Sequence, residues 1–213
     1  MADVAVIDYG VGNLLSVSRA LLHCGATVEV TDDPARILNA RRVVLPGVGA
    51  FAYGMDALQA RRLVDVVHEV SRRGTPLLGI CLGMQMLMDT SAEFGETAGL
   101  GLITGRVVPV PERATDGEPQ KIPHIGWNGL APASTPAAWS GTLLDGIAPG
   151  ESVYFVHSFM AQPEDDAHRL ADCLYGGVAV SAVIRNLNVM GCQFHPEKSG
   201  EVGLRVLKNF LRP

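Results

Sequence analysis

Cysteine is scarce in this 213-residue sequence, and its four copies stand far apart, at Cys24, Cys81, Cys173 and Cys192. No Cys-x-x-Cys pair occurs, so the pattern predicts neither a zinc site nor a disulfide framework, and we expect no bound metal. No apolar run approaches the roughly 20 residues that cross a membrane. No basic segment leads into a long apolar one, so we expect no signal peptide, no membrane contact and a cytoplasmic location.

Basic residues are also few. Lysine and arginine together number 17 against 22 aspartates and glutamates, which gives a formal net charge of −5. The arginine pairs at 41–42, 61–62 and 72–73 are isolated from one another, and this argues against a nucleic-acid partner. Hydrophobic residues make up 47% and charged residues 18%, which predicts a compact protein. The length suits one domain that spans residues 1–213.

The first eighty residues alternate strand-like apolar runs with segments of helical periodicity. Such alternation predicts a parallel sheet with helices on both faces. The acidic pair before Pro34 is typical of the start of a short helix. The expected strands lie at 3–8, 27–30, 42–45 and 76–80. The other expected helices lie at 13–23, 50–60 and 63–73.

The second half consists mostly of strand-like segments, so antiparallel neighbours are expected there. A closing helix is expected at 199–211, with Ser199 as its cap. The fold class is therefore α/β, a single three-layer αβα domain whose mostly parallel central sheet carries antiparallel additions in its C-terminal half. The expected strands are 106–110, 127–130, 153–159, 169–174, 178–185 and 189–194.

One cysteine stands where a nucleophile would be expected. The apolar run that ends at Ile80 leads into Gly-x-Cys-x-Gly, and a helix-forming segment follows. A thiol at the apex of such a turn lies at a helix N-terminus, where the dipole favours thiolate. Gly79 and Gly83 permit the tight turn and close backbone approach of a nucleophile elbow. Cys81 is therefore a candidate nucleophile, and a buried structural cysteine is the alternative.

A second motif, His195-Pro196-Glu197, follows the apolar run 189–194. If the segment is extended, the side chains two residues apart point the same way, so Glu197 could orient the imidazole of His195. A strand-end histidine beside a solvated glutamate is the alternative. Together with Cys81, the motif supplies a nucleophile, a base and an orienting acid, the three parts of covalent acyl transfer.

Acyl transfer also needs donors for the oxyanion. The backbone N–H of Leu82, directly after Cys81, is one candidate. Val48 lies between two glycines in the loop at 46–49, so its peptide could rotate and complete or break the oxyanion hole. An ordinary turn between a strand and a helix is the alternative interpretation of this loop.

The motifs Gly-Ile-Cys-Leu-Gly-Met-Gln at 79–85 and Phe-His-Pro-Glu at 194–197 resemble those of class I (triad) glutamine amidotransferases. Four further segments resemble the glutaminase subunits of imidazole glycerol phosphate synthases. They are Asp-Tyr-Gly-Val-Gly-Asn-Leu at 8–14, Leu-Pro-Gly-Val-Gly-Ala-Phe at 45–51, Pro-His-Ile-Gly-Trp-Asn at 123–128 and Tyr-Phe-Val-His-Ser-Phe at 154–159. The resemblance covers essentially the whole chain.

The resemblance implies an activity. Such subunits hydrolyse L-glutamine to glutamate and ammonia through a cysteine thioester, without a cofactor. They form a heterodimer with a (β/α)₈ cyclase subunit, which uses the ammonia to make imidazole glycerol phosphate and AICAR from PRFAR in histidine biosynthesis. Three alternatives stay open: a glutaminase that serves another synthase, a free-standing cysteine peptidase or γ-glutamyl hydrolase, and a binding module without catalysis.

The resemblance also assigns roles to residues of this chain. Cys81, His195 and Glu197 match the catalytic triad, and Val48 and Leu82 match the oxyanion donors. Four positions match residues that hold the substrate glutamine: Gly49, Gln85, Ser158 and Phe159. Four others match positions that face the cyclase, namely Asn13, Trp127, Tyr154 and Lys198, although the two aromatics could simply be core or rim residues. The loop at 111–120 is longer than expected of the family and has no assigned role.

Overall fold

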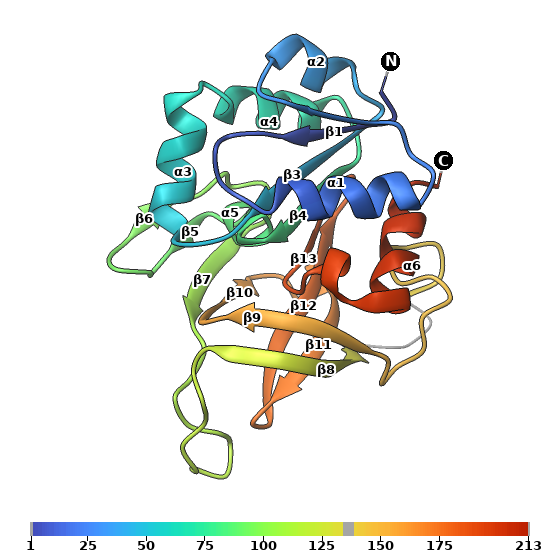
Figure 1. Ribbon diagram of the computed structural model, residues 1–213. Coiled ribbons are helices and arrows are strands. Elements are labelled where there is room, and N and C mark those ends of the chain that lie inside the picture. The colour runs from blue at the N-terminus through green and yellow to red at the C-terminus, as the bar shows by residue number, and fades with distance from the viewer. Residues whose placement is uncertain (1, 134–138, 213) are drawn as a thin grey trace.

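A large central sheet organises the computed structural model, which describes residues 2–133 and 139–212 (Figure 1). Over the described residues the sheet has nine strands in the order β2-β1-β3-β4-β13-β12-β11-β8-β9. The neighbours from β2 to β13 pair in parallel, and those from β13 to β9 pair antiparallel. The strands are β1 (Val4–Ile7), β2 (Val28–Thr31), β3 (Arg42–Gly47), β4 (Leu77–Cys81), β8 (His124–Pro132), β9 (Ser152–His157), β11 (Arg169–Tyr175), β12 (Val178–Asn186) and β13 (Val189–Cys192).

Helices cover both faces of the parallel part. Side chains alternate across each buried strand, so Val44 packs with one layer of helices while Val43 and Leu45 pack with the other. One layer holds α1 (Leu14–His23) and α6 (Gly200–Phe210). The other holds α2 (Pro34–Asn39), α3 (Phe51–Ala60), α4 (Val64–Arg72) and α5 (Leu82–Met86). The predicted three-layer α/β arrangement is confirmed.

The sequence correctly indicated the starts of two helices. Asn13 accepts a hydrogen bond from Ser16 N at 3.4 Å and caps α1. Asp33 accepts one from Ala35 N at 2.8 Å and caps α2, whose first residue is Pro34. Both side chains satisfy backbone donors that the first turn of a helix leaves free.

The strand-rich half differs from the prediction in two ways. The segment expected as one strand at 153–159 breaks at Ser158, so β9 stays in the large sheet while β10 (Phe159–Pro163) enters a second one. That smaller sheet, in the order β10-β7-β5-β6, was not predicted. Its other strands are β5 (Thr90–Ser91), β6 (Thr97–Ala98) and β7 (Gly105–Pro109), and two of these are too short to show a pattern of alternation.

Three neighbouring parallel strands deliver the candidate site. In register, Gly47 at the end of β3 lies beside Cys81 at the end of β4, and Ile80 lies beside Cys192 at the end of β13. The carboxyl ends of β3, β4 and β13 therefore meet at one edge, which is where open α/β sheets bind their ligands. The loop at 110–123 extends away from this body beside β8 (Figure 1).

No helix within the described ranges is both long enough and apolar enough to span a bilayer.

Candidate active site

Cys81 stands at a sharp turn between β4 and α5. Its backbone has φ +55° and ψ −110°, a conformation that non-glycine residues rarely adopt. Such a strained conformation persists only where the surrounding structure holds it, and residues of this kind cluster at functional sites. The side chain is 7% exposed, and it opens onto a pocket of about 280 Å³. The predicted strand–turn–helix arrangement is therefore present.

The two glycines around Cys81 are needed for close packing, and neither has a positive φ. A Cβ on Gly83 would lie 1.9 Å from the Leu45 carbonyl oxygen, and one on Gly79 would lie 2.6 Å from the Gly83 carbonyl oxygen. Helix α5 therefore rests directly on β3 and β4. The left-handed backbone conformation falls on the cysteine itself.

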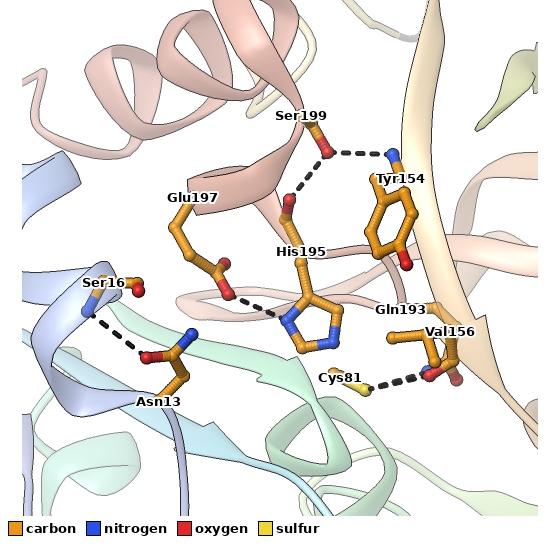
Figure 2. A network of polar contacts seen from close by, with 9 residues as sticks. All are labelled: Asn13, Ser16, Cys81, Tyr154, Val156, Gln193, His195, Glu197 and Ser199. Atoms are coloured by element: carbon orange, nitrogen blue, oxygen red, sulfur yellow. Dashed lines mark hydrogen bonds and ion pairs between the residues drawn. The ribbon is translucent and has the colours of Figure 1, made fainter. Parts of the chain in front are cut away.

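His195 and Glu197 form a buried pair. The His195 Nδ1 lies 2.8 Å from the Glu197 Oε1, and the side chains are 3% and 1% exposed. Figure 2 shows the imidazole between the Glu197 carboxylate and the Cys81 sulfur, with its other nitrogen towards the sulfur. The chain contains both the predicted residues and the predicted contact.

The predicted geometry behind that contact is wrong. Residues Pro196–Lys198 form a 3₁₀ turn, η3, so the segment is not extended when it reaches Glu197. β13 also ends at Cys192, two residues earlier than expected. Pro196 supplies the fixed φ that begins the turn, and the turn brings the carboxylate back onto the imidazole.

The electrostatics favour a charged imidazole. Burial by itself lowers the pKa of His195, but interactions with Cys81 and Glu197 outweigh it and raise that pKa to about 9. Within the described chain, the Nε2 atom of His195 has no hydrogen-bond partner of normal geometry. It is therefore free to exchange a proton with the sulfur that it faces.

Ser199 holds the backbone of His195. Its hydroxyl donates to the His195 carbonyl oxygen at 2.6 Å and accepts from Tyr154 N at 2.9 Å. His195 N in turn donates to the Tyr154 carbonyl oxygen at 3.0 Å. The expectation that the Ser199 side chain caps α6 is therefore wrong, because its hydroxyl makes these tertiary contacts instead.

The pocket beside Cys81 gathers the other residues predicted for substrate and oxyanion. It is lined by Val48, Gly49, Cys81, Leu82, Gln85, Glu93, Pro123, Val156, His157, Ser158, Phe159 and His195. Leu82 is the first residue of α5, so its N–H has no partner inside the helix. Gly49 has φ +95°, which suits glycine alone, and the preceding Val48 is 41% exposed.

Gln85 does more than line this pocket. Its Nε2 donates to the Phe159 carbonyl oxygen and to the Gln193 Oε1, both at 2.9 Å. Gln193 is fully buried, and its Nε2 donates to the Cys81 sulfur at 3.7 Å. The sequence analysis missed Gln193 because it lies within the run 189–194, which looked like core. The Ser158 carbonyl oxygen accepts from Val110 N at 2.9 Å.

A series of hydrogen bonds through two buried histidines, which the sequence analysis also missed, leads from β8 to the Phe159 carbonyl oxygen. Asn128 Nδ2 lies 3.0 Å from His124 Nε2, His124 Nδ1 lies 2.9 Å from His157 Nε2, and His157 Nδ1 lies 2.9 Å from the Phe159 carbonyl oxygen. A carbonyl oxygen only accepts, so neutral rings fit one direction of donation, from Asn128 towards Phe159. Burial lowers the pKa of both histidines to about 4.

The residues assigned to a partner surface are placed around the triad. Trp127 lies opposite Tyr154 across the β8–β9 pair, with ring centroids 6.0 Å apart, and is 56% exposed. Lys198 is exposed on η3, and Asn13 is half-buried at the start of α1. In Figure 2, Asn13 and Tyr154 flank the His195–Glu197 pair from opposite sides.

The other three cysteines do not line the pocket beside Cys81. Burial raises the pKa of Cys173 to about 12 and that of Cys192 well above its ordinary value. Burial also raises the pKa of the half-buried Cys24. These three thiols stay protonated and inert at neutral pH, as the sequence analysis expected of Cys173 and Cys192.

Comparison with known proteins identifies the family. The family model of "Glutamine amidotransferase class-I" matches residues 5–213. The chain belongs to this family. The chain is 53% identical over 212 residues to "Imidazole glycerol phosphate synthase subunit HisH 1" of Legionella pneumophila (strain Lens), with 100% of both chains covered.

Other relatives of this amidotransferase agree. The "Imidazole glycerol phosphate synthase subunit HisH" of Geobacillus thermodenitrificans (strain NG80-2) is 48% identical over 211 residues, covering 99% of this chain and 96% of the relative. A solved structure titled "Crystal structure of glutamine amidotransferase" has a TM-score of 0.72 at 18% identity, covering 98% of this chain and 97% of that one. The similarity to this solved structure supports the fold alone.

Proposed function

We propose that this amidotransferase hydrolyses L-glutamine and supplies the ammonia to a cyclase that makes imidazole glycerol phosphate and AICAR from PRFAR in histidine biosynthesis. The observation that carries the chemistry is Cys81, strained at the head of α5, facing an imidazole that Glu197 holds at 2.8 Å. The relatives' names, which call them subunits of imidazole glycerol phosphate synthase, support the biosynthetic role.

The proposed cycle uses the triad in three roles. The proton on the Cys81 sulfur passes to His195 Nε2, and the thiolate attacks the carboxamide carbon of glutamine. His195 then gives that proton to the departing nitrogen, the carbon–nitrogen bond breaks, and ammonia leaves a thioester on Cys81. Water, activated by the same imidazole, releases glutamate. Glu197 remains ionised and stabilises the imidazolium throughout.

The pocket supplies the remaining groups. The N–H groups of Leu82 and Val48 are the proposed oxyanion donors, since both residues line the pocket beside the sulfur. Gly49, Gln85, Ser158 and Phe159 are the proposed contacts of the substrate. Glu93, which lines the same pocket and accepts from Phe51 N at 2.6 Å, adds a carboxylate suited to the substrate's ammonium group.

The partner is proposed to be a (β/α)₈ cyclase subunit that forms a heterodimer with this chain over Asn13, Trp127, Tyr154 and Lys198. Ammonia released into neutral water becomes mostly ammonium, which has no free lone pair. Docking the two subunits would keep the ammonia neutral until it reacts. Trp127 is more than half exposed and lies opposite Tyr154, whose carbonyl oxygen accepts from His195 N, which favours a covered surface over a core role.

One experiment tests the proposal. In the chain assembled with a cyclase subunit, Cys81→Ala is expected to abolish synthesis driven by glutamine and to leave synthesis driven by ammonia intact. Cys192→Ala is the control, because that thiol is buried and does not line the pocket. Glutamine-driven product in the Cys81→Ala complex would overturn the nucleophile. High turnover without any cyclase would favour a free-standing γ-glutamyl hydrolase.

A further inference from the structure

The Cys81 sulfur touches a second polar group besides the catalytic imidazole. The side-chain amide nitrogen of Gln193 lies 3.7 Å from the sulfur, and Gln193 belongs to the segment that connects β13 with His195. A second sulfur contact, to the Val156 carbonyl oxygen at 4.0 Å, can only receive the thiol proton. Loss of that proton therefore leaves the sulfur facing one oxygen that repels it and one N–H that attracts it.

The direction of the Gln193 amide is fixed by its neighbours. The Phe159 carbonyl oxygen is an acceptor, so the NH₂ group of Gln85 must face it. The same NH₂ group donates to the oxygen of Gln193, and this leaves the NH₂ group of Gln193 facing the sulfur. His157 Nδ1 donates to the same Phe159 carbonyl oxygen. This second hydrogen bond holds in place the carbonyl group that orients Gln85.

We propose that Gln193 is a further catalytic residue whose amide N–H stabilises the Cys81 thiolate, and that Gln85 is a positioning residue that fixes which end of that amide meets the sulfur. The inference rests on the proposed role of Cys81 as nucleophile. Gln193 is 0% exposed and Gln85 is 5% exposed, so water does not compete for these hydrogen bonds. Hydrogen bonds to charged groups are among the stronger ones in proteins.

The test measures the sulfur directly. Iodoacetamide alkylates thiolate without requiring bound glutamine. Its rate as a function of pH, followed on the Cys81 peptide by mass spectrometry, gives the midpoint of ionisation. Gln193→Met keeps the volume and removes the donor. The midpoint is expected to rise by about one unit, with alkylation at neutral pH about tenfold slower. Gln85→Met is expected to give a smaller rise, because the Gln193 donor remains but can turn.

A matched control is Gln162→Met, the same substitution at an exposed position on β10. It is expected to leave the midpoint unchanged. An unchanged midpoint in Gln193→Met would overturn the inference. Should that variant fail to fold, the wild-type protein decides: the side-chain NH₂ signals of Gln193 in NMR spectra should shift with the same midpoint as alkylation, and should not shift in Cys81→Ser. Signals that ignore the titration would overturn the inference.

Failure of this inference is distinguishable from failure of the proposed function. If glutamine is hydrolysed normally while Gln193→Met leaves the midpoint unchanged, the role of Gln193 falls and the triad stands. If the midpoint moves as expected but no cyclase elicits glutamine hydrolysis, the thiolate donor stands and the proposed function falls.

Discussion

Glu197 is the residue of the triad whose environment most constrains its role. One carboxylate oxygen meets His195 at 2.8 Å, and the other is buried without a hydrogen-bond partner in the described chain. An uncompensated buried oxygen of this kind is costly, so the site retains it for the charge that it supplies. That charge is one of the influences that raise the pKa of His195.

Glu197→Gln is therefore expected to slow glutamine hydrolysis by up to about 10⁴-fold, the loss that follows replacement of a triad's orienting carboxylate by its amide. The loss should stay smaller than that of Cys81→Ala, because the nucleophile and base remain. Steady-state ammonia release by the complex measures both. Glu201→Gln, an exposed change in the first turn of α6, serves as control. Equal losses in Glu197→Gln and Cys81→Ala would contradict a purely orienting role.

At the residue scale, local motifs predicted the triad because each motif carries its own geometry. Gly-x-Cys-x-Gly specifies a turn, and His-Pro-Glu places an acid within reach of a base. Gln193 and His157 could not be found in this way, since their hydrogen bonds join segments 108 and 33 residues distant. Only the registers of β13, β4 and β9 bring those groups together.

Helix α5 is the element on which the site depends most. It begins at the nucleophile and packs against β3 and β4 so closely that its second residue must be glycine. At five residues it contributes little stability of its own, so tertiary packing has to hold it. The orientation of the Leu82 N–H and of the Cys81 sulfur follows from that packing.

Gly83→Ala is expected to lower the free energy of unfolding by about 1–3 kcal/mol, the range for an overpacked core, and to reduce activity as well. The added methyl group would lie 1.9 Å from the Leu45 carbonyl oxygen, so α5 must move away from β3. Urea unfolding curves measure the change. Gly54→Ala in α3 is the control, because its new methyl group meets mainly the flexible side chains of Met86 and Leu82. Equal stability of the two variants would contradict this account of the close approach.

Elements in the first half were predictable because apolar runs alternate there with segments of helical periodicity, and because two of the helices, α1 and α2, begin with a capping side chain. The second half was predicted less well for a physical reason. The break at Ser158 moves the chain from one sheet to another, and no glycine or proline marks it. The 3₁₀ turn at Pro196–Lys198 is three residues long, which is too short to show a helical period in the sequence.

For the whole molecule, buried histidines make stability depend on pH. His124 and His157 have pKa values of about 4 in the folded state, lowered by burial from an ordinary value of 6.5. The unfolded chain therefore binds more protons between those values, and stability should fall as pH is lowered from about 6.5 to about 4, by up to about 1.4 kcal/mol per pH unit per histidine. The raised pKa of His195 acts oppositely, so its contribution is lost as pH rises from 6.5 to about 9.

Urea unfolding at a series of pH values tests this dependence. His157→Gln should flatten the acid side of the profile, because one of the two titrating groups is gone. His68→Gln, at an exposed position on α4, is the matched control and should leave the slope as in the wild type. A slope in His157→Gln as steep as in the wild type would contradict the conclusion that the buried, neutral His157 contributes to this pH dependence.

At this scale the fold class and the family could both be predicted from the sequence, and the family match confirms the resemblance. That residues 1–213 form a single domain, that the protein is cytoplasmic, and that the four surface residues meet a cyclase all stay predictions. The last two depend on a compartment and on a partner, which lie outside the chain itself.

The central claim is that Cys81 attacks the glutamine side chain. The most direct measurement is to treat the chain, assembled with a cyclase subunit, with the glutamine analogue 6-diazo-5-oxo-L-norleucine and to locate the adduct by peptide mass spectrometry. The account predicts one adduct, on Cys81, that glutamine suppresses and that does not form in Cys81→Ala. An adduct on Cys24, Cys173 or Cys192 with Cys81 unmodified would contradict it.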